Sequence, residues 1–161
     1  MSISDLIVVM KDGALRQSAK PQTVYDDPED LFVAKFLGTP PVNVFAGTVK
    51  DGTLIVADGK VLSVPGVRDG EVTVGVRPEG FVPKPDGGLV CALERVEVLG
   101  RDTSLIFASP ALEAVSGRAV VDAEDAAGLL PGGIRFALKP SKTLLFEKDS
   151  GKRIRIGNAE G

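Results

Sequence analysis

The chain has 161 residues, of which 43% are hydrophobic and 25% are charged, and its formal net charge is -3. This balance is typical of a domain with a core, and the length suits one medium domain or a small domain with an extension. Lysine and arginine are scattered singly and tryptophan is absent. Nucleic acid is therefore not expected as a partner, because phosphates need a concentrated basic face and single strands need stacking surfaces. No apolar run approaches the roughly 18 residues of a membrane span, so direct insertion is not expected either.

Histidine is absent and Cys91 is the only cysteine. These counts exclude a histidine-dependent catalytic triad, a histidine-containing zinc site and an intramolecular disulfide, and they fit a reducing cytoplasm. Cys91 lies in the apolar run LVCAL, where a buried and unreactive thiol is expected. We therefore predict no catalytic residue, no metal ligand and no cofactor-binding residue.

The first predicted element is a β-hairpin. The apolar run from Leu6 to Met10 indicates one strand and 14–19 the other, with a tight turn at Lys11-Asp12-Gly13. Pro21 suits the first turn of a short helix that continues to Asp26.

A second short helix follows. Asp27 is predicted to cap it, Pro28 fits its first position, and Gly38 ends it. One face carries an apolar stripe of Phe32, Val33, Phe36 and Leu37. We expect this stripe to pack on its own domain, and a docking surface is the alternative.

Beyond a stiff linker at 39–43, the pattern changes to short strands separated by Gly, Pro and Asp turns. The predicted strands are 44–49, 53–57, 60–64, 71–76, 89–99, 103–108, 118–121, 134–139, 143–147 and 153–156. A turn or two of helix is expected within 123–130. Many short strands without long helices between them predict a mainly β fold, an antiparallel barrel or sandwich.

The stretch TVGVRPEGF, from Thr73 to Phe81, ends a strand at Arg77-Pro78-Glu79. Pro78 cannot donate to a β-ladder, so it ends the pairing. Arg77 is expected to be an anchor that binds a carboxylate or backbone carbonyls when covered, with small-anion binding and catalysis as the alternatives. Catalysis is the weaker alternative, because neither a nucleophile nor a partner base accompanies Arg77 and Glu79.

The stretch LGRDT presents Gly100, Arg101 and Asp102. A turn between two strands is expected there, and the alternative is a loop at an oxyanion- or sugar-binding groove. On the preceding strand, Glu94 and Glu97 indicate a bulge with solvated carboxylates. Neither a Walker A pattern nor a G-x-G-x-x-G after a strand occurs, so the sequence contains no recognisable phosphate-binding loop.

Taken in order, four segments resemble the C-terminal part of ATP-binding subunits of sugar-type ABC importers, the maltose and glycerol-phosphate class. They are SDLIVVMKDGALRQSAKPQTVYDDPEDLFVAKFLGTPPVN (4–43), GVRPEGF (75–81), EVLGRDTSLIF (97–107) and GIRFALKPSKTLLFEKDSGKRI (133–154). The resemblance implies that 1–38 end the ATPase domain, 39–43 form a linker and 44–161 form an OB-like barrel, the TOBE domain. At Gly80 the sequence departs from the family, which often has a histidine or another larger residue there.

The resemblance also implies a function. The upstream Walker and signature motifs are missing, so the chain should be a piece of a longer protein or a truncated product that does not hydrolyse ATP, whereas a complete subunit would bind ATP and Mg²⁺. The expected role is regulation and homodimerisation next to ABC permease subunits, at the cytoplasmic face of the membrane. The predicted interface or regulatory residues are Arg77, Glu79, Gly100, Arg101, Asp102, Phe32 and Phe36.

Two other functions remain open. One is a free-standing OB-type module for a small oxyanion, a sugar or an oligonucleotide, with Arg77 or Arg101 as the anion contact. The other is a small hydrolase whose site carries no recognisable motif. Under the favoured function, the charged turn at Arg77 would be presented to a neighbouring protein surface.

Overall fold

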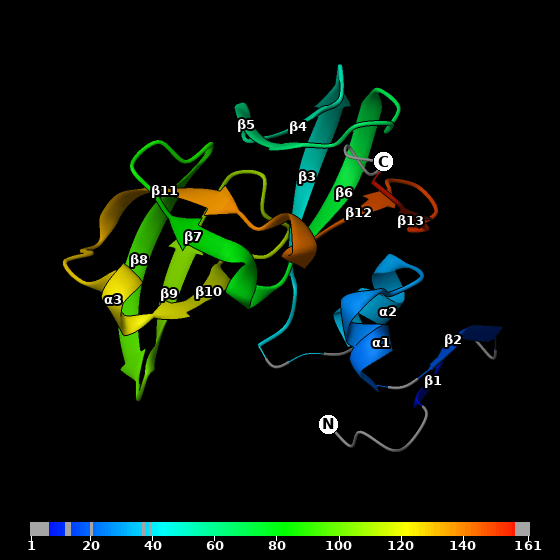
Figure 1. Ribbon diagram of the computed structural model, residues 1–161, viewed down its shortest axis with the longest axis horizontal. Coiled ribbons are helices and arrows are strands. Elements are labelled where there is room, and N and C mark those ends of the chain that lie inside the picture. Colours follow the sequence, from blue (N-terminus) through cyan, green and yellow to red (C-terminus); the bar gives the residue numbers. More distant parts are fainter. Residues whose placement is uncertain (1–6, 12–13, 20, 37, 39, 157–161) are drawn as a thin grey trace.

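The computed structural model describes residues 7–11, 14–19, 21–36, 38 and 40–156, with side chains from Gln22 onward. Strands β1 (Ile7–Lys11) and β2 (Ala14–Ala19) form the predicted antiparallel hairpin, whose turn lies outside the described residues. Helices α1 (Pro21–Asp26) and α2 (Leu31–Phe36) lie between this hairpin and the β domain (Figure 1). No helix in the described ranges is long and apolar enough to cross a membrane.

Helix α2 begins later than the sequence indicated. The backbone N–H of Val33 donates to Asp30 Oδ1 at 3.0 Å, so Asp30 caps the helix and the predicted cap at Asp27 is wrong. Tertiary contacts explain the shift, because the Arg153 N–H donates to the Glu29 carbonyl at 3.0 Å and Asp30 forms a β-bridge with Lys152. These bonds engage the backbone that would otherwise start the helix. The predicted stripe residue Leu37 lies outside the described residues.

The β domain consists of two antiparallel sheets. The first has the order β13-β12-β6-β3-β4-β5, with β3 (Asn43–Lys50), β4 (Thr53–Val56), β5 (Gly59–Ser63), β6 (Gly70–Val76), β12 (Thr143–Glu147) and β13 (Arg153–Ile154). The second has the order β10-β9-β8-β11-β7, with β7 (Phe81–Pro83), β8 (Leu89–Leu99), β9 (Asp102–Ala108), β10 (Gly117–Asp122) and β11 (Gly132–Leu138).

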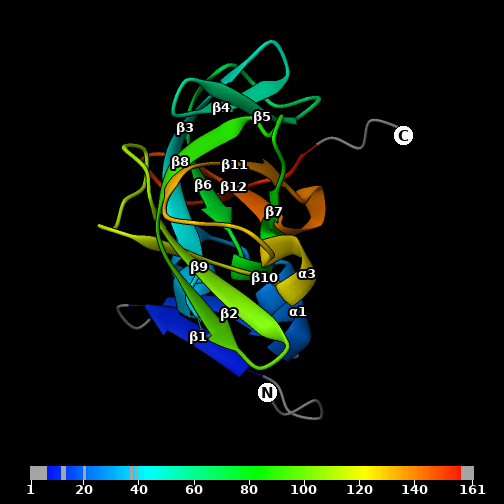
Figure 2. The same ribbon diagram turned by 90° about the vertical axis from the view of Figure 1, so that its left-hand side faces the viewer.

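The predicted strands are confirmed to within one or two residues, and the short helix becomes α3 (Ala123–Ala126). Strand β7 was not predicted, because its three residues are too few to show alternation. Two 3₁₀ turns, η1 (Pro78–Gly80) and η2 (Pro140–Lys142), precede β7 and β12. The β4–β5 hairpin and the β1–β2 hairpin lie at opposite ends of the molecule (Figure 2).

One hydrophobic core lies between the two sheets. Its centre is a group of four phenylalanines with ring centroids 5.1 to 6.3 Å apart. These are Phe45, Phe81, Phe107 and Phe136. Alternating residues of two strands are buried against this core, on β6 from Val72 to Val76 and on β11 from Ile134 to Leu138. Alternation therefore identified the core-facing side of both sheets.

The two sheets meet at two seams, one closed by side-chain hydrogen bonds and the other by a close approach of backbones. At one seam, Asn43 of β3 donates through Nδ2 to the carbonyls of Val76 (3.1 Å) and Arg118 (3.0 Å), while its Oδ1 accepts from the Arg118 N–H at 2.8 Å. At the other seam, a Cβ at Gly59 would lie 1.9 Å from the Gly88 carbonyl oxygen, so the backbones approach as closely as glycine allows. The result is a mainly β, OB-like and nearly closed antiparallel barrel, as predicted.

Helix α2 covers the outer face of the first sheet. Along β12, Leu145 faces the barrel core, whereas Leu144 and Phe146 pack with Leu31 and Ala34 of α2. Strand β12 is therefore buried on both faces, which explains its continuous apolar sequence.

Candidate functional site

Arg77 lies at the end of β6 and binds the two helices. Its side chain is only 2% exposed, and its guanidinium donates from Nη1 to the Ala34 carbonyl (3.0 Å) and from Nη2 to the Tyr25 carbonyl (2.7 Å). The guanidinium carbon also lies 4.0 Å from the centroid of the Tyr25 ring. Burial lowers the pKa of Arg77, and the carbonyls and the ring face compensate for its lost hydration. The anchor predicted for backbone carbonyls is confirmed, but the prediction that the charge at Arg77 is presented to a neighbouring protein surface is wrong, because the guanidinium is buried against the chain's own helices.

Glu79 joins the same group through Tyr25. The Tyr25 hydroxyl donates to both carboxylate oxygens of Glu79, at 2.8 and 3.1 Å. Burial and this acidic acceptor raise the pKa of Tyr25 to about 12. Lys142 Nζ lies 3.7 Å from Glu79 Oε2 and 3.9 Å from Asp26 Oδ1. We call Tyr25, Ala34, Arg77, Glu79 and Lys142 the Arg77 cluster.

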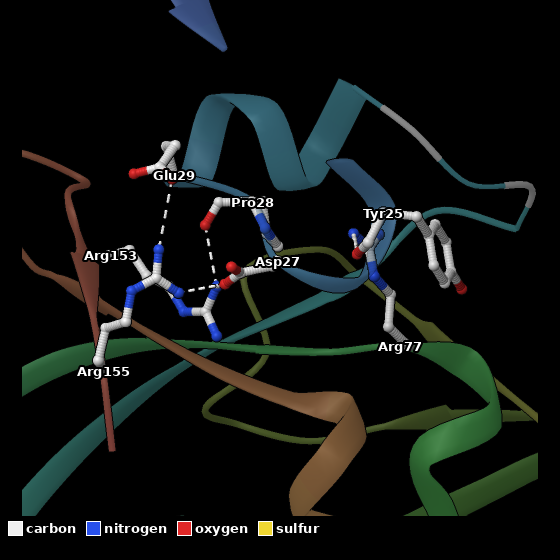
Figure 3. Close-up of polar contacts among 7 residues, drawn as sticks. All are labelled: Tyr25, Asp27, Pro28, Glu29, Arg77, Arg153 and Arg155. Atoms are coloured by element: carbon white, nitrogen blue, oxygen red, sulfur yellow. Dashed lines mark hydrogen bonds and ion pairs between the residues drawn. The ribbon is translucent and has the colours of Figure 1, made fainter. Parts of the chain in front are cut away.

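A second group holds the segment between the helices. Arg153 Nη1 donates to Asp27 Oδ1 at 3.0 Å and to the Pro28 carbonyl at 2.9 Å, and Arg155 pairs with Asp27 and with Glu29 (3.4 Å). We call these five residues the Arg153 cluster. Figure 3 shows the Arg153 cluster at one side of the helical segment, and Arg77 with Tyr25 at the other. Both fix it to the β domain.

Three predicted site residues lie elsewhere, at the turn between β8 and β9. Gly100 has a φ of +67°, Arg101 is exposed and its carbonyl accepts from the Ala123 N–H, and Asp102 begins β9. Asp102 and Glu79 line one hollow of about 200 Å³. The predicted turn is confirmed, and so is the bulge near Glu94, where the β8–β9 register shifts.

The two predicted phenylalanines lie on α2, with ring centroids 6.3 Å apart. Phe32 is half-buried, whereas Phe36 is 58% exposed. The prediction that the whole stripe packs on its own domain is therefore wrong for Phe36. The cap at Asp30 turns Val33 and Ala34 toward the domain instead.

A groove of about 450 Å³ runs beside the linker and β9. Apolar side chains such as Ile106 and Leu112 line it together with Arg95 and Arg118. Hydrogen bonds from these two arginines hold the pKa of Glu97 below its usual range. Among the described residues, no group of three or more His, Cys, Asp or Glu side chains could hold a metal ion.

Sequence reasoning missed the partners of Arg77. The only signal for Tyr25 in the sequence is that it is the single tyrosine of the chain. No spacing rule connects it with Arg77, because the two positions are far apart. Cys91 is buried as expected, and burial raises its pKa to about 12.

No family model matches the chain. A sn-glycerol-3-phosphate import ATP-binding protein of Jannaschia is 32% identical over 158 residues, which are 96% of this chain and 43% of that protein. A sulfoquinovosyl glycerol transport ATP-binding protein of Agrobacterium fabrum is 31% identical over 96% of this chain and 45% of its own length. The chain thus spans less than half the length of these relatives.

Among solved structures, the cytoplasmic molybdate-binding protein ModG is 19% identical with a TM-score of 0.46. The match covers 64% of this chain and 94% of that one.

Proposed function

Since the chain is related over nearly its whole length to ATP-binding subunits of ABC importers, we propose that it is the regulatory and dimerisation part of such a subunit and catalyses no reaction itself. The ATPase core would belong to the part of the relatives that this chain does not match. In a transporter, the chain would lie at the cytoplasmic face of the membrane, next to permease subunits, and the complete subunit would use ATP and Mg²⁺.

One observation carries this proposal. The alignment covers 96% of the chain but only 43% of an ATP-binding relative, and the Walker A pattern that binds phosphates is absent from the whole sequence. The matched part is therefore a part of such proteins that lacks the phosphate-binding loop.

The two clusters give this part a mechanical role. We assign 1–38 to the end of the ATPase domain, 39–43 to the linker and 44–161 to the TOBE-type β domain. The Arg77 and Arg153 clusters then join the end of the ATPase domain to the β domain. A displacement of the ATPase domain is therefore passed to the β domain. Arg77 and Glu79 act as positioning residues in this proposal. Exposed Phe36 faces the ATPase core.

The alternative of a free-standing oxyanion-binding module has less support. Arg77 was one of its two predicted anion contacts, but the guanidinium is buried and donates to two carbonyls of the chain. Arg101 lies at an exposed turn, and a single exposed cation binds an anion weakly in water.

Two measurements on the 161-residue chain test the proposal. Sedimentation equilibrium should show a monomer–dimer equilibrium that depends on concentration. Calorimetric titration with Mg-ATP should show no binding at ATP concentrations up to about 1 mM, which corresponds to the dissociation constant of a weak ligand. ATP binding in the micromolar range or measurable hydrolysis would refute the non-catalytic role, and a monomer at every concentration would refute dimerisation.

A further inference from the structure

The outer half of β8 is an exposed sheet edge. Strand β11 pairs with β8 only as far as Gly132 opposite Leu93. From Arg95 to Leu99, the described strands provide β8 with a partner on one side only, β9. Figure 1 shows the β8–β9 hairpin extending well beyond β11. An edge of this kind presents unpaired N–H and C=O groups that can add another strand.

The side chains on this edge do not protect it from pairing. Natural edges are often blocked by an inward-pointing charge, a proline or a single-sign row of lysines. Here the sequence is Arg95-Val96-Glu97-Val98-Leu99, with Val98 70% and Leu99 61% exposed. These two side chains add exposed apolar surface at the end of the open edge.

The charge pattern indicates which partner fits. In an antiparallel pair centred on Val96, Val96 lies opposite its own copy, and Arg95 of each chain lies opposite Glu97 of the other. Directly opposite charges stabilise a strand pair, and the two-fold axis produces each such contact twice. The charges at positions 95 and 97 are therefore complementary to those of a second copy, while Glu94 lies opposite Val98.

Neighbouring registers lack this match. Centring the pair on Glu97 places two like carboxylates opposite each other, and centring it on Arg95 places two guanidiniums opposite each other. Shifting one strand by a single residue also loses the match between Arg95 and Glu97. In one direction both charges face valines, and in the other Glu94 faces Glu97. Because like charges across a strand pair are unfavourable, one register is selected.

The start of β11 leaves room for the second strand. Gly132 and Gly133 carry no side chains, and no atom lies within 4 Å of where a Cβ would stand at either position. Neither glycine therefore places a side chain in the path of a strand that leaves the pair near Leu93.

We infer that residues 94–98 of β8 form an antiparallel strand pair with the same residues of a second copy of the chain, in the register centred on Val96. This inference rests on the proposed dimerisation and names its surface. Five residues make a contact below the standard size of stable interfaces, so the isolated chain should dimerise weakly and reversibly. Arg118, which donates to Glu97 at 3.2 Å, adds a third charge to the contact and makes association sensitive to salt.

Charge reversal provides the test. R95E alone and E97R alone should each weaken the dimer by about tenfold or more, because each places like charges opposite one another twice. An equimolar mixture of the two variants should associate, since every carboxylate then faces a guanidinium of the other chain. The matched control is the pair K148E and E71K, which reverses an exposed ion pair of 3.2 Å on the other sheet. Neither control variant, nor their mixture, should change association.

Sedimentation equilibrium measures association, and far-UV circular dichroism verifies that each variant is folded. A wild-type dimer that survives both single reversals overturns the edge-pairing inference and leaves dimerisation itself intact. So does a wild-type dimer whose variants separate but do not associate when mixed. A monomeric wild type overturns the inference together with proposed dimerisation.

Discussion

Replacing Arg77 by methionine keeps an apolar side chain of similar length and removes every donor. The hydrogen bonds to the Ala34 and Tyr25 carbonyls and the contact with the Tyr25 ring are lost. A hydrogen bond to a charged group contributes about 1.5–3 kcal/mol, and a cation–π contact about 0.5–2 kcal/mol. The guanidinium also no longer has to be desolvated, which offsets several kcal/mol of that sum. We expect a net loss of about 3 kcal/mol, localised in the attachment of α1 and α2.

Tyr25 provides the assay. It is the only tyrosine in a chain without tryptophan, and it lies inside the Arg77 cluster, so its fluorescence reports this attachment. Circular dichroism reports the β domain. In the wild type, urea transitions followed by the two probes should coincide. In Arg77→Met, the tyrosine transition should move to lower urea, ahead of the circular dichroism transition.

The control is Arg101→Met, the same chemical change at an exposed turn. It should leave both transitions unchanged, because an exposed side chain loses little when it is replaced. If the free energy of unfolding of Arg77→Met lies within about 0.5 kcal/mol of the wild-type value by both probes, the buried guanidinium does not hold the helices.

Three further outcomes are expected. Asn43→Ala, which removes two hydrogen bonds to Arg118 across a seam of the barrel and one to Val76 within the first sheet, should lower the free energy of unfolding by about 3 kcal/mol in a urea titration. Tyr25 has a folded-state pKa of about 12 against 10.0 in the reference state, so stability should fall as the pH rises from 10 toward 12; Tyr25→Phe should lack that part of the decline. Gly80→Ala places a Cβ 2.8 Å from Lys142 Cβ and should lower the free energy of unfolding by about 1–3 kcal/mol. Gly133→Ala, where the added Cβ meets open space, should lower it less. Equal losses in the two variants would contradict the packing argument.

Local sequence patterns predicted most of the β domain because each strand carried its own signal. Alternation on β6 and β11 and turns at Asp-Gly pairs gave both the strands and their buried faces. Strand β7 was missed because three residues are too few to show a period. Helix α2 was placed too early, since the competing bonds to Glu29 and Asp30 come from residues more than a hundred positions away.

The candidate site was only half predictable. The stretch Arg77-Pro78-Glu79 could be recognised as the end of a strand with a potential anchor, because proline and paired charges have local meanings. Its partner could not be found, since Tyr25 is brought to it only by the packing of α2 on β12. The open edge of β8 was also invisible, because it depends on where β11 stops pairing.

The double burial of β12 determines how the helices and the barrel can move. Leu144 and Phe146 pack with α2, while Leu145 belongs to the core that both sheets share. A closely packed interior transmits displacement instead of absorbing it. Helix α2 cannot slide on β12 without opening the Arg77 cluster at one end or the Arg153 cluster at the other. Under the proposed function, a movement of the ATPase core would therefore reach the β8 edge as a rigid-body rotation of the whole β domain.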